Sequence, residues 1–203
     1  MNLAQFREKT LYHGLSLGAV SLVAGLALAL TDNTTHAAIR AAEARDLQLS
    51  LVQVLPAGFA DNDLLKDQTS IKREDGSAVV VYRARLQGQI KGAVFQVGER
   101  GYAGEVAVLM GVDYAGNILG VRVVKHGETP GLGDKIDAAK SRWILDFDGK
   151  SLGDPTPEKW AVKKDGGQFD QFAGATVTPR AVVKAVKGGL VFYAAHREEI
   201  FAK

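Results

Sequence analysis

Residues 78–124 read AVVVYRARLQGQIKGAVFQVGERGYAGEVAVLMGVDYAGNILGVRVV, and this stretch decides the fold. It contains four runs rich in Val, Ile, Tyr and Phe, which favour strands, over 78–86, 89–97, 105–113 and 118–124. A Gln-Gly turn ending at Gly88 joins the first two runs, and Tyr114-Ala-Gly-Asn117 joins the last two. Connections this short join antiparallel neighbours, so the pattern predicts two β-hairpins.

Segments on either side of the hairpins complete the expected domain. Apolar residues at helical spacing predict helices over Asp134–Phe147 and Pro179–Ala195, with a short strand over Trp160–Lys164 between them. The polar residues Asp61–Ser77 are expected to form a connecting region. The fold class predicted from these elements is α+β, a twisted antiparallel sheet with packed helices.

The N-terminal part of the chain is apolar. Residues 14–30 read GLSLGAVSLVAGLALAL, and the run over 11–31 is long enough for a helix to cross a hydrocarbon core of ~30 Å. Arg7 and Lys9 precede it, which favours a cytoplasmic N-terminus. The expected organisation is a cytoplasmic tail (1–10), a transmembrane helix (11–31), a helical stalk (32–56) and an extracytoplasmic domain (57–203). The alternative is a cleaved secretory signal, although the apolar run is longer than is usual for one.

Composition excludes several kinds of chemistry. The chain has no cysteine, which rules out disulfides, iron–sulfur clusters, thiolate zinc sites and cysteine nucleophiles. Its four histidines are scattered, and neither a Gly-x-Ser-x-Gly elbow nor a phosphate-loop signature is present. A formal net charge of +2 without a basic run gives no footprint for nucleic acid. A bound redox cofactor would supply the chemistry that these side chains lack.

Two loops are unusually rich in small and turn-forming residues. Residues 126–136 read HGETPGLGDKI, and the glycines allow backbone amides to approach a ligand closely. Residues 170–180 read DQFAGATVTPR and lead into the last helix. Thr178 is expected to be its N-cap, which would place Thr176 beside the positive end of a helix, where a phosphate is stabilised. Each loop also has an ordinary interpretation, as a strand-to-helix connection and as a capped helix start.

Together with Gly101-Tyr-Ala-Gly104 and the N-terminal anchor, these loops resemble the G subunit of the Rnf/Rsx complex, the ion-translocating oxidoreductase between ferredoxin and NAD. The same FMN-binding domain occurs in the C subunit of the sodium-translocating NADH:quinone oxidoreductase. The resemblance covers nearly the whole chain and implies an electron-carrying flavoprotein subunit rather than a self-sufficient enzyme. It further implies FMN joined to Thr176 through a phosphoester by a separate flavin transferase. One departure is Ala173, which stands where the motif usually has Ser or Thr.

The resemblance also implies a location and partners. We expect a single-pass protein of the bacterial inner membrane with its C-terminal domain in the periplasm. Its partners would be the other membrane and redox subunits of the complex, and the flavin transferase during maturation. The alternatives are a secreted soluble flavin carrier and a non-redox flavin-binding sensor or scaffold.

The expected flavin contacts come from both loops. The ring should lie against Thr129, Leu132 and Gly133, with Glu128 setting the loop conformation and Tyr102 stacking nearby. Gly174 and Ala175 leave room beside the backbone, and Thr178 and the amides near Ala175 should receive the phosphate. Lys163 or Lys164 should neutralise the phosphate, and we assign this role to Lys164.

Overall fold

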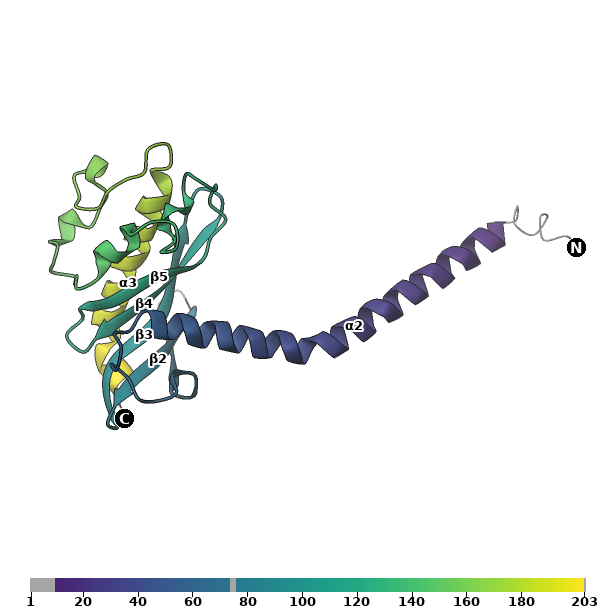
Figure 1. Cartoon of the computed structure of the whole chain (residues 1–203), viewed down its shortest axis with the longest axis horizontal. Coiled ribbons are helices and arrows are strands. Elements are labelled where there is room, and N and C mark those ends of the chain that lie inside the picture. Colours follow the sequence, from purple (N-terminus) through teal and green to yellow (C-terminus); the bar gives the residue numbers. More distant parts are fainter. Residues whose placement is uncertain (1–9, 74–75, 203) are drawn as a thin grey trace, which may run out of the picture. The chain divides into compact units, whose positions relative to one another are not determined.

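The computed structural model describes residues 10–73 and 76–202. The chain divides into two units, residues 1–46 and 47–203. Helix α2 (Thr10–Gln53) runs without interruption through the predicted span and most of the predicted stalk (Figure 1). Its last turns belong to the second unit.

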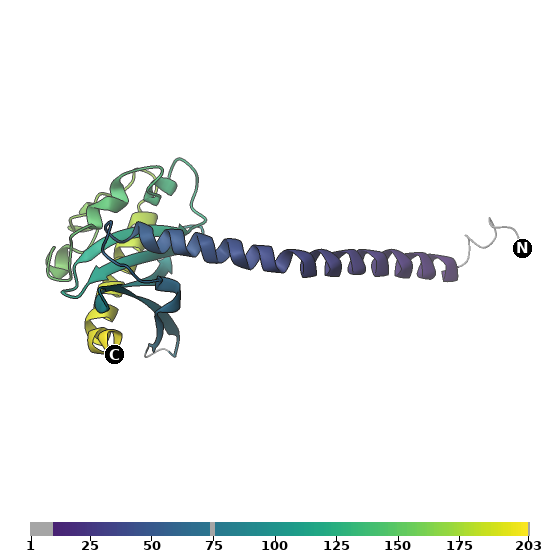
Figure 2. The ribbon, with the colours of Figure 1, turned by 60° about the horizontal axis from the view of Figure 1, so that its bottom comes forward.

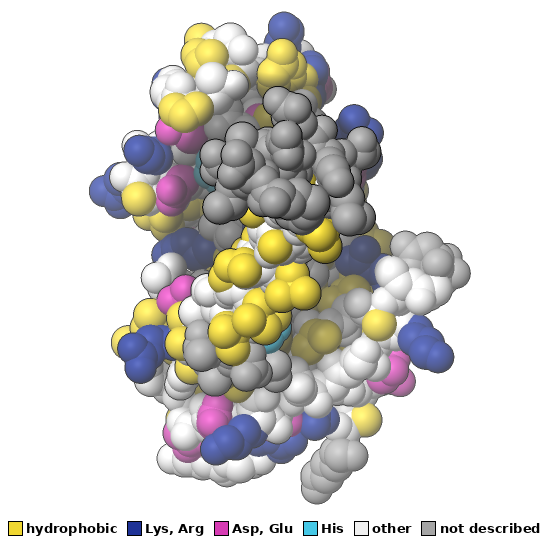
Figure 3. Space-filling model, turned by 90° about the vertical axis from the view of Figure 1, so that its right-hand side faces the viewer, with side chains coloured by type: hydrophobic (Ala, Val, Ile, Leu, Met, Phe, Trp, Pro, Cys, Tyr) yellow, Lys and Arg dark blue, Asp and Glu magenta, His cyan; other side chains and the backbone are white. Residues whose placement is uncertain are grey.

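Within α2, the segment Tyr12–Asp32 is long and apolar enough to cross a membrane. Its mean hydropathy is 1.9, and its apolar stretch is not buried in the structure. Leu17, Leu22 and Leu28 are 71%, 70% and 72% exposed. Figure 3 shows hydrophobic side chains gathered in the middle of the face that it draws. A continuous apolar surface of this kind requires a partner or a lipid environment.

The second unit is built on a five-stranded antiparallel sheet in the order β1-β2-β3-β4-β5. The strands are β1 (Gln68–Lys72), β2 (Ala78–Leu86), β3 (Gln89–Arg100), β4 (Glu105–Asp113) and β5 (Ile118–Lys125). The α+β fold class and the four predicted strands are confirmed. Strand β1 lies in the segment that was expected to be a connecting region. The sequence did not predict it, because QTSIK has a single buried residue, Ile71.

Both faces of the sheet are covered. Helix α3 (Val177–Phe201) packs on one face, and Figures 1 and 2 show it, in yellow, behind the central strands and along them. Neighbouring residues of β4, Leu109 and Met110, belong to different hydrophobic clusters, and successive side chains of a strand point to opposite faces. The cluster of Leu109 contains Leu51 and Val54, so the end of α2 covers the face opposite α3.

The segment between β5 and α3 contradicts two predictions. The expected helix over 134–147 is two short 3₁₀ helices, η2 (Asp134–Ile136) and η3 (Trp143–Phe147). Between them the carbonyl of Asp137 accepts hydrogen bonds from the amides of Lys140 and Ser141, and its side chain accepts one from Ala139. Local side-chain acceptors of this kind favour turns over helix, although Ile136, Trp143, Ile144 and Phe147 are still buried.

The expected strand over 160–164 is also wrong. Val162 forms only an isolated bridge with Phe169, and η5 (Lys163–Asp165) follows at once, ending at Gly166 with φ 82°. A further short helix, η4 (Pro157–Lys159), precedes this segment, and η1 (Leu64–Lys66) precedes β1.

Packing between aromatic side chains, rather than a long helix or a strand, holds this segment together. The Phe147 and Phe169 rings stack with centroids 4.5 Å apart, and Trp143 meets Phe172 edge-on at 5.2 Å. The Trp143 indole N–H donates to the carbonyl of Asp170 at 2.9 Å. The cluster therefore holds the chain that leads into α3.

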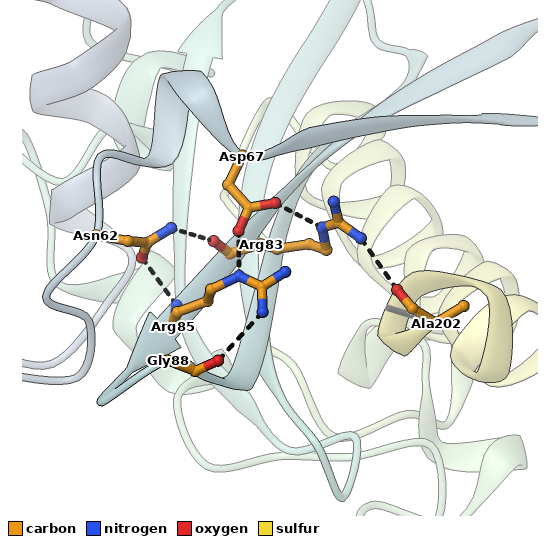
Figure 4. Close-up of polar contacts among 6 residues, drawn as sticks. All are labelled: Asn62, Asp67, Arg83, Arg85, Gly88 and Ala202. Atoms are coloured by element: carbon orange, nitrogen blue, oxygen red, sulfur yellow. Dashed lines mark hydrogen bonds and ion pairs between the residues drawn. The ribbon is translucent and has the colours of Figure 1, made fainter.

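The Asp67 carboxylate, just before β1, binds two arginines of β2, and one of them reaches the end of α3 (Figure 4). Asp67 accepts hydrogen bonds from Nε of Arg83, at 2.7 Å, and from Nε of Arg85. Arg83 Nη1 also donates to the carbonyl of Ala202 at 3.1 Å. The Asn62 side chain donates to the carbonyl of Arg83 and accepts from the amide of Arg85. Arg83 thereby places a positive charge at the C-terminal end of α3, where it is favourable.

The Asp67 network predicts a loss of stability in acid. Burial alone would raise the pKa of Asp67, but the hydrogen bonds from Arg85 and Arg83 outweigh it and lower the pKa. A carboxyl whose pKa falls on folding contributes stability above its unfolded pKa of about 3.9, and this contribution is lost as the pH drops through the folded value. In urea unfolding, Asp67→Asn should cost about 1–3 kcal/mol at pH 7 and reduce the fall in stability below pH ~4. A matched Glu198→Gln change, at an exposed position, should alter neither quantity, and equal acid sensitivity of Asp67→Asn and the unsubstituted chain would contradict the assignment.

Candidate functional site

A cavity of about 300 Å³ lies where the turn after β3, the loop after β5 and the start of α3 meet. This volume is at the lower end of the range for small-molecule sites. The structure brings together every predicted contact residue except Lys164. The lining residues are Tyr102, Glu128, Thr129, Leu132, Gly133, Gly174, Ala175, Thr176, Val177 and Thr178.

One buried carboxylate joins the three segments. Glu128 is 5% exposed, and its Oε1 accepts hydrogen bonds from the backbone amides of Tyr102 (3.0 Å) and Ala103 (3.1 Å). Its Oε2 accepts a hydrogen bond from the hydroxyl of Thr178, which is 0% exposed. Hydrogen bonds to a charged acceptor are stronger than neutral ones, so this carboxylate is a substantial link between distant parts of the chain.

Two glycines make room for this carboxylate. A Cβ atom at Gly101 would lie 2.6 Å from Oε1 of Glu128. A Cβ atom at Gly133 would lie 2.9 Å from both the Cβ of Glu128 and the hydroxyl oxygen of Thr178. These separations are shorter than non-bonded contacts allow, so both positions require glycine.

The loop after β5 has a compact turn of its own. The carbonyl of Thr129 accepts hydrogen bonds from the amides of Leu132 and Gly133, both at 3.1 Å. Gly131 has φ 78°, which glycine adopts without strain, and its amide donates to Asp134 Oδ1 at 2.8 Å. The turn leaves Leu132 45% exposed at the cavity wall, so Leu132 is not a core residue.

Thr176 is itself the N-cap of α3. The prediction that Thr178 is the N-cap is therefore wrong, because the helix begins at Val177 and the Thr178 hydroxyl is engaged by Glu128. The Thr176 side chain makes no capping hydrogen bond. The first amides of a helix lack intrahelical acceptors, so this end of a 25-residue helix offers free donors and a positive dipole at the cavity.

The turn before Thr176 presents small residues. Gly174 has φ 78°, and the amide of Ala175 donates to the carbonyl of Phe172 at 3.1 Å. A Cβ atom at Gly174 would lie 3.7 Å from Leu132 Cδ2, so the two loops come close to each other here. Ala173 is exposed and does not line the cavity, so the hydroxyl absent from this position leaves the cavity wall unchanged.

The lysines expected near the phosphate lie elsewhere. Lys164 is exposed and does not line the cavity. Lys163 pairs with the Asp170 carboxylate at 2.6 Å, and both side chains are more than half exposed. Sequence reasoning missed Val177, which is 44% exposed at the cavity wall, and its place beside Thr176 was the only signal for it.

Comparison with known proteins gives the chain close relatives. The family described as an FMN-binding domain matches residues 101–191. The G subunit of the ion-translocating oxidoreductase complex of Cereibacter sphaeroides is 48% identical over 97% of this chain and 90% of its own length. Proteins with the same name from Stutzerimonas stutzeri (48% identical, 93% of this chain, 83% of the relative) and Pseudomonas aeruginosa (47%, 98% and 95%) are equally similar.

Solved structures share the fold at low sequence identity. One is the crystal structure of Shewanella oneidensis NqrC, with a TM-score of 0.50 and 22% identity, covering 72% of this chain and 74% of that one. Another is the C subunit of the Na⁺-translocating NADH-quinone reductase from Parabacteroides distasonis, with a TM-score of 0.52 and 19% identity, covering 79% and 94%. These similarities support the fold assigned above.

The cavity residues fit an FMN group by their chemistry. A phosphate could bind the uncapped amides of the first turn of α3 and the Thr176 hydroxyl, which makes no capping hydrogen bond. A flat aromatic ring could pack against the side chains of Leu132, Val177 and Tyr102, which line the cavity and are all more than 40% exposed.

The packing of glycine against Glu128 can be tested by adding one methyl group. Gly133→Ala should lower the free energy of unfolding by about 1–3 kcal/mol, because the new Cβ overlaps Glu128 and Thr178. Gly127→Ala is the matched control in the same loop, since its Cβ would meet only Ala103, at 3.5 Å or more, and should change stability by less than ~0.5 kcal/mol. Equal urea midpoints for the two variants would contradict the close approach.

Proposed function

This chain belongs to the family formed by the G subunits of ion-translocating oxidoreductase complexes, and we propose that it carries FMN as a phosphoester on Thr176. The complex would be of the type that transfers electrons between ferredoxin and NAD. In this role the chain is an electron-carrying subunit, with the other membrane and redox subunits as partners.

The observation that carries the proposal is the free hydroxyl at a helix N-terminus. A threonine at an N-cap ordinarily accepts a hydrogen bond from an amide of the first turn. The Thr176 side chain makes no such bond, which leaves its oxygen available to a phosphorus atom and leaves the amides to the phosphate oxygens. Thr178, the other hydroxyl nearby, is fully buried on Glu128 and is therefore a poor acceptor for a transferase.

The remaining cavity residues would bind and shield the ring. Leu132 and Val177 present apolar side chains that exclude water from a ring lying against them, and Tyr102, 76% exposed, offers a stacking surface. FMN itself supplies one- and two-electron transfer when bound. Among the described residues that line the cavity there is no His, Lys or Arg, so the protein's part is to hold and orient the group.

The same proposal places the protein in the bacterial inner membrane. Residues Tyr12–Asp32 would span it once, residues 1–10 would remain in the cytoplasm, and the domain would lie in the periplasm. A covalent tether would prevent loss of FMN to that compartment. A separate flavin transferase would form the bond there.

Substitution of the acceptor tests the covalent bond. Thr176→Ala should abolish flavin fluorescence of the denatured band in a gel, whereas Thr176→Ser, which retains a hydroxyl, should keep it. Neither change should alter the unfolding free energy by more than ~0.5 kcal/mol, because no capping hydrogen bond is lost. A fluorescent band that persists in Thr176→Ala would overturn the assignment.

Reporter fusions test the orientation. Alkaline phosphatase fused after Lys203 should be active, because it folds only outside the cytoplasm, and a fluorescent protein that matures only inside should stay dark. The intact mass of the mature protein should include residues 1–31. The opposite reporter pattern would reject the periplasmic location, and a mass lacking those residues would favour the secreted carrier.

A further inference from the structure

Glu128 carries a charge that holding a phosphate does not require. Its carboxylate is 5% exposed and lines the cavity. Within the part of the chain that the structure describes, no Lys, Arg or His side chain forms an ion pair with it. Asp67 and Glu99, by contrast, are paired with arginine and lysine.

The hydrogen bonds of Glu128 are those of an ionised carboxylate. Both oxygens act as acceptors, from two backbone amides and from the Thr178 hydroxyl. Thr178 lies in the first turn of α3, so the positive end of that helix also faces the carboxylate. Neutral donors and a dipole thus stabilise the negative charge without cancelling it.

We propose that Glu128 is a positioning residue with a second effect: it fixes the Tyr102 turn to the start of α3, and its uncompensated charge lowers the midpoint potential of the flavin. This inference rests on the FMN proposed above. Two electrons from a donor of the complex and one proton convert the oxidised ring to its reduced anion, which carries one more negative charge. A buried anion at the cavity wall repels that added charge and so disfavours reduction.

The isosteric variant Glu128→Gln separates charge from position. Its amide oxygen still accepts hydrogen bonds from Tyr102 and Ala103. Its NH₂ group would donate to the Thr178 hydroxyl oxygen, which reverses the direction of that hydrogen bond but keeps the two groups joined, while the charge is removed. In the full-length protein, titrated with dithionite and redox mediators, the ratio of reduced to oxidised flavin at a fixed potential should rise at least tenfold. For a two-electron couple this corresponds to about 30 mV towards positive potential.

Glu198→Gln is the matched control for charge. It removes an exposed carboxylate that does not line the cavity, so it should leave the flavin potential within a threefold change in the same ratio. Thr178→Val tests position alone, since it removes one hydrogen bond of Glu128 and should lower the urea midpoint. Should Glu128→Gln fail to accumulate as folded protein, Glu128→Asp and Glu128→Asn replace it, because they have equal length and differ in charge. The Asn variant should then have the higher potential.

The outcomes distinguish this inference from the proposed function. A fluorescent denatured band in both Glu128→Gln and the unsubstituted chain, with a raised potential in the variant, supports the charge effect. An unchanged or lowered potential in the flavinylated variant, or equal potentials for Asp and Asn, overturns this inference alone. An unsubstituted chain without covalent flavin, matured in the presence of its transferase, overturns the proposed function.

Discussion

The cavity depends on the hydrogen bonds of one buried carboxylate to groups that are distant in sequence. Glu128 binds amides 25 and 26 residues before it and a hydroxyl 50 residues after it. Each of the three segments lies at the end of a strand or the start of a helix. Loss of these donors would leave a buried carboxylate without hydrogen bonds, so the contacts of Glu128 with the Tyr102 turn and with Thr178 stabilise one another.

The sheet provides the rigid base for this arrangement. Strands β3 and β5 flank β4, so the turn that ends β3 and the loop that follows β5 lie at the same end of the sheet. Helix α3 packs against β3 and β4. Its N-terminus lies beside the turn after β3 and the loop after β5. On the opposite face, Gly120 allows the backbone of Val54 to approach closely, since a Cβ atom would lie 3.0 Å from the Val54 carbonyl oxygen. The last turns of α2 are thus part of the domain core rather than a loose linker.

Much of the fold and of the candidate site could be predicted from the sequence, and the predictions that failed did so for physical reasons. Long apolar strands such as β4, with its seven buried residues after Glu105, are evident in the sequence. Strand β1 is not evident, because an edge strand buries few side chains. The spacing of Ile136, Trp143 and Phe147 suits a helix, but the side chains of Asp137 and Ser141 accept hydrogen bonds from nearby amides and interrupt that helix. The two loops were recognised by their small and turn-forming residues, and a resemblance to a family then gave their expected role, but the hydrogen bond of Thr178 to Glu128 was not predicted. Its partner is too distant in sequence for a capping rule to reveal, and the same rule favoured Thr178 over Thr176.

The segment from η2 to Thr176 is held by rings rather than by a hydrogen-bonded ladder. Phe147 stacks on both Trp160 and Phe169, which meet each other at a tilt. Few of the backbone amides there belong to a helix or strand. Such a region opens locally at a lower free energy than a five-stranded sheet does. Amides around residues 137–176 should therefore exchange with deuterium through small fluctuations, whereas those of β3 and β4 exchange only with global unfolding. Under the proposed function, an enzyme that attached FMN to Thr176 would therefore act on the part of the domain that opens at the lowest free energy, while the sheet stays folded.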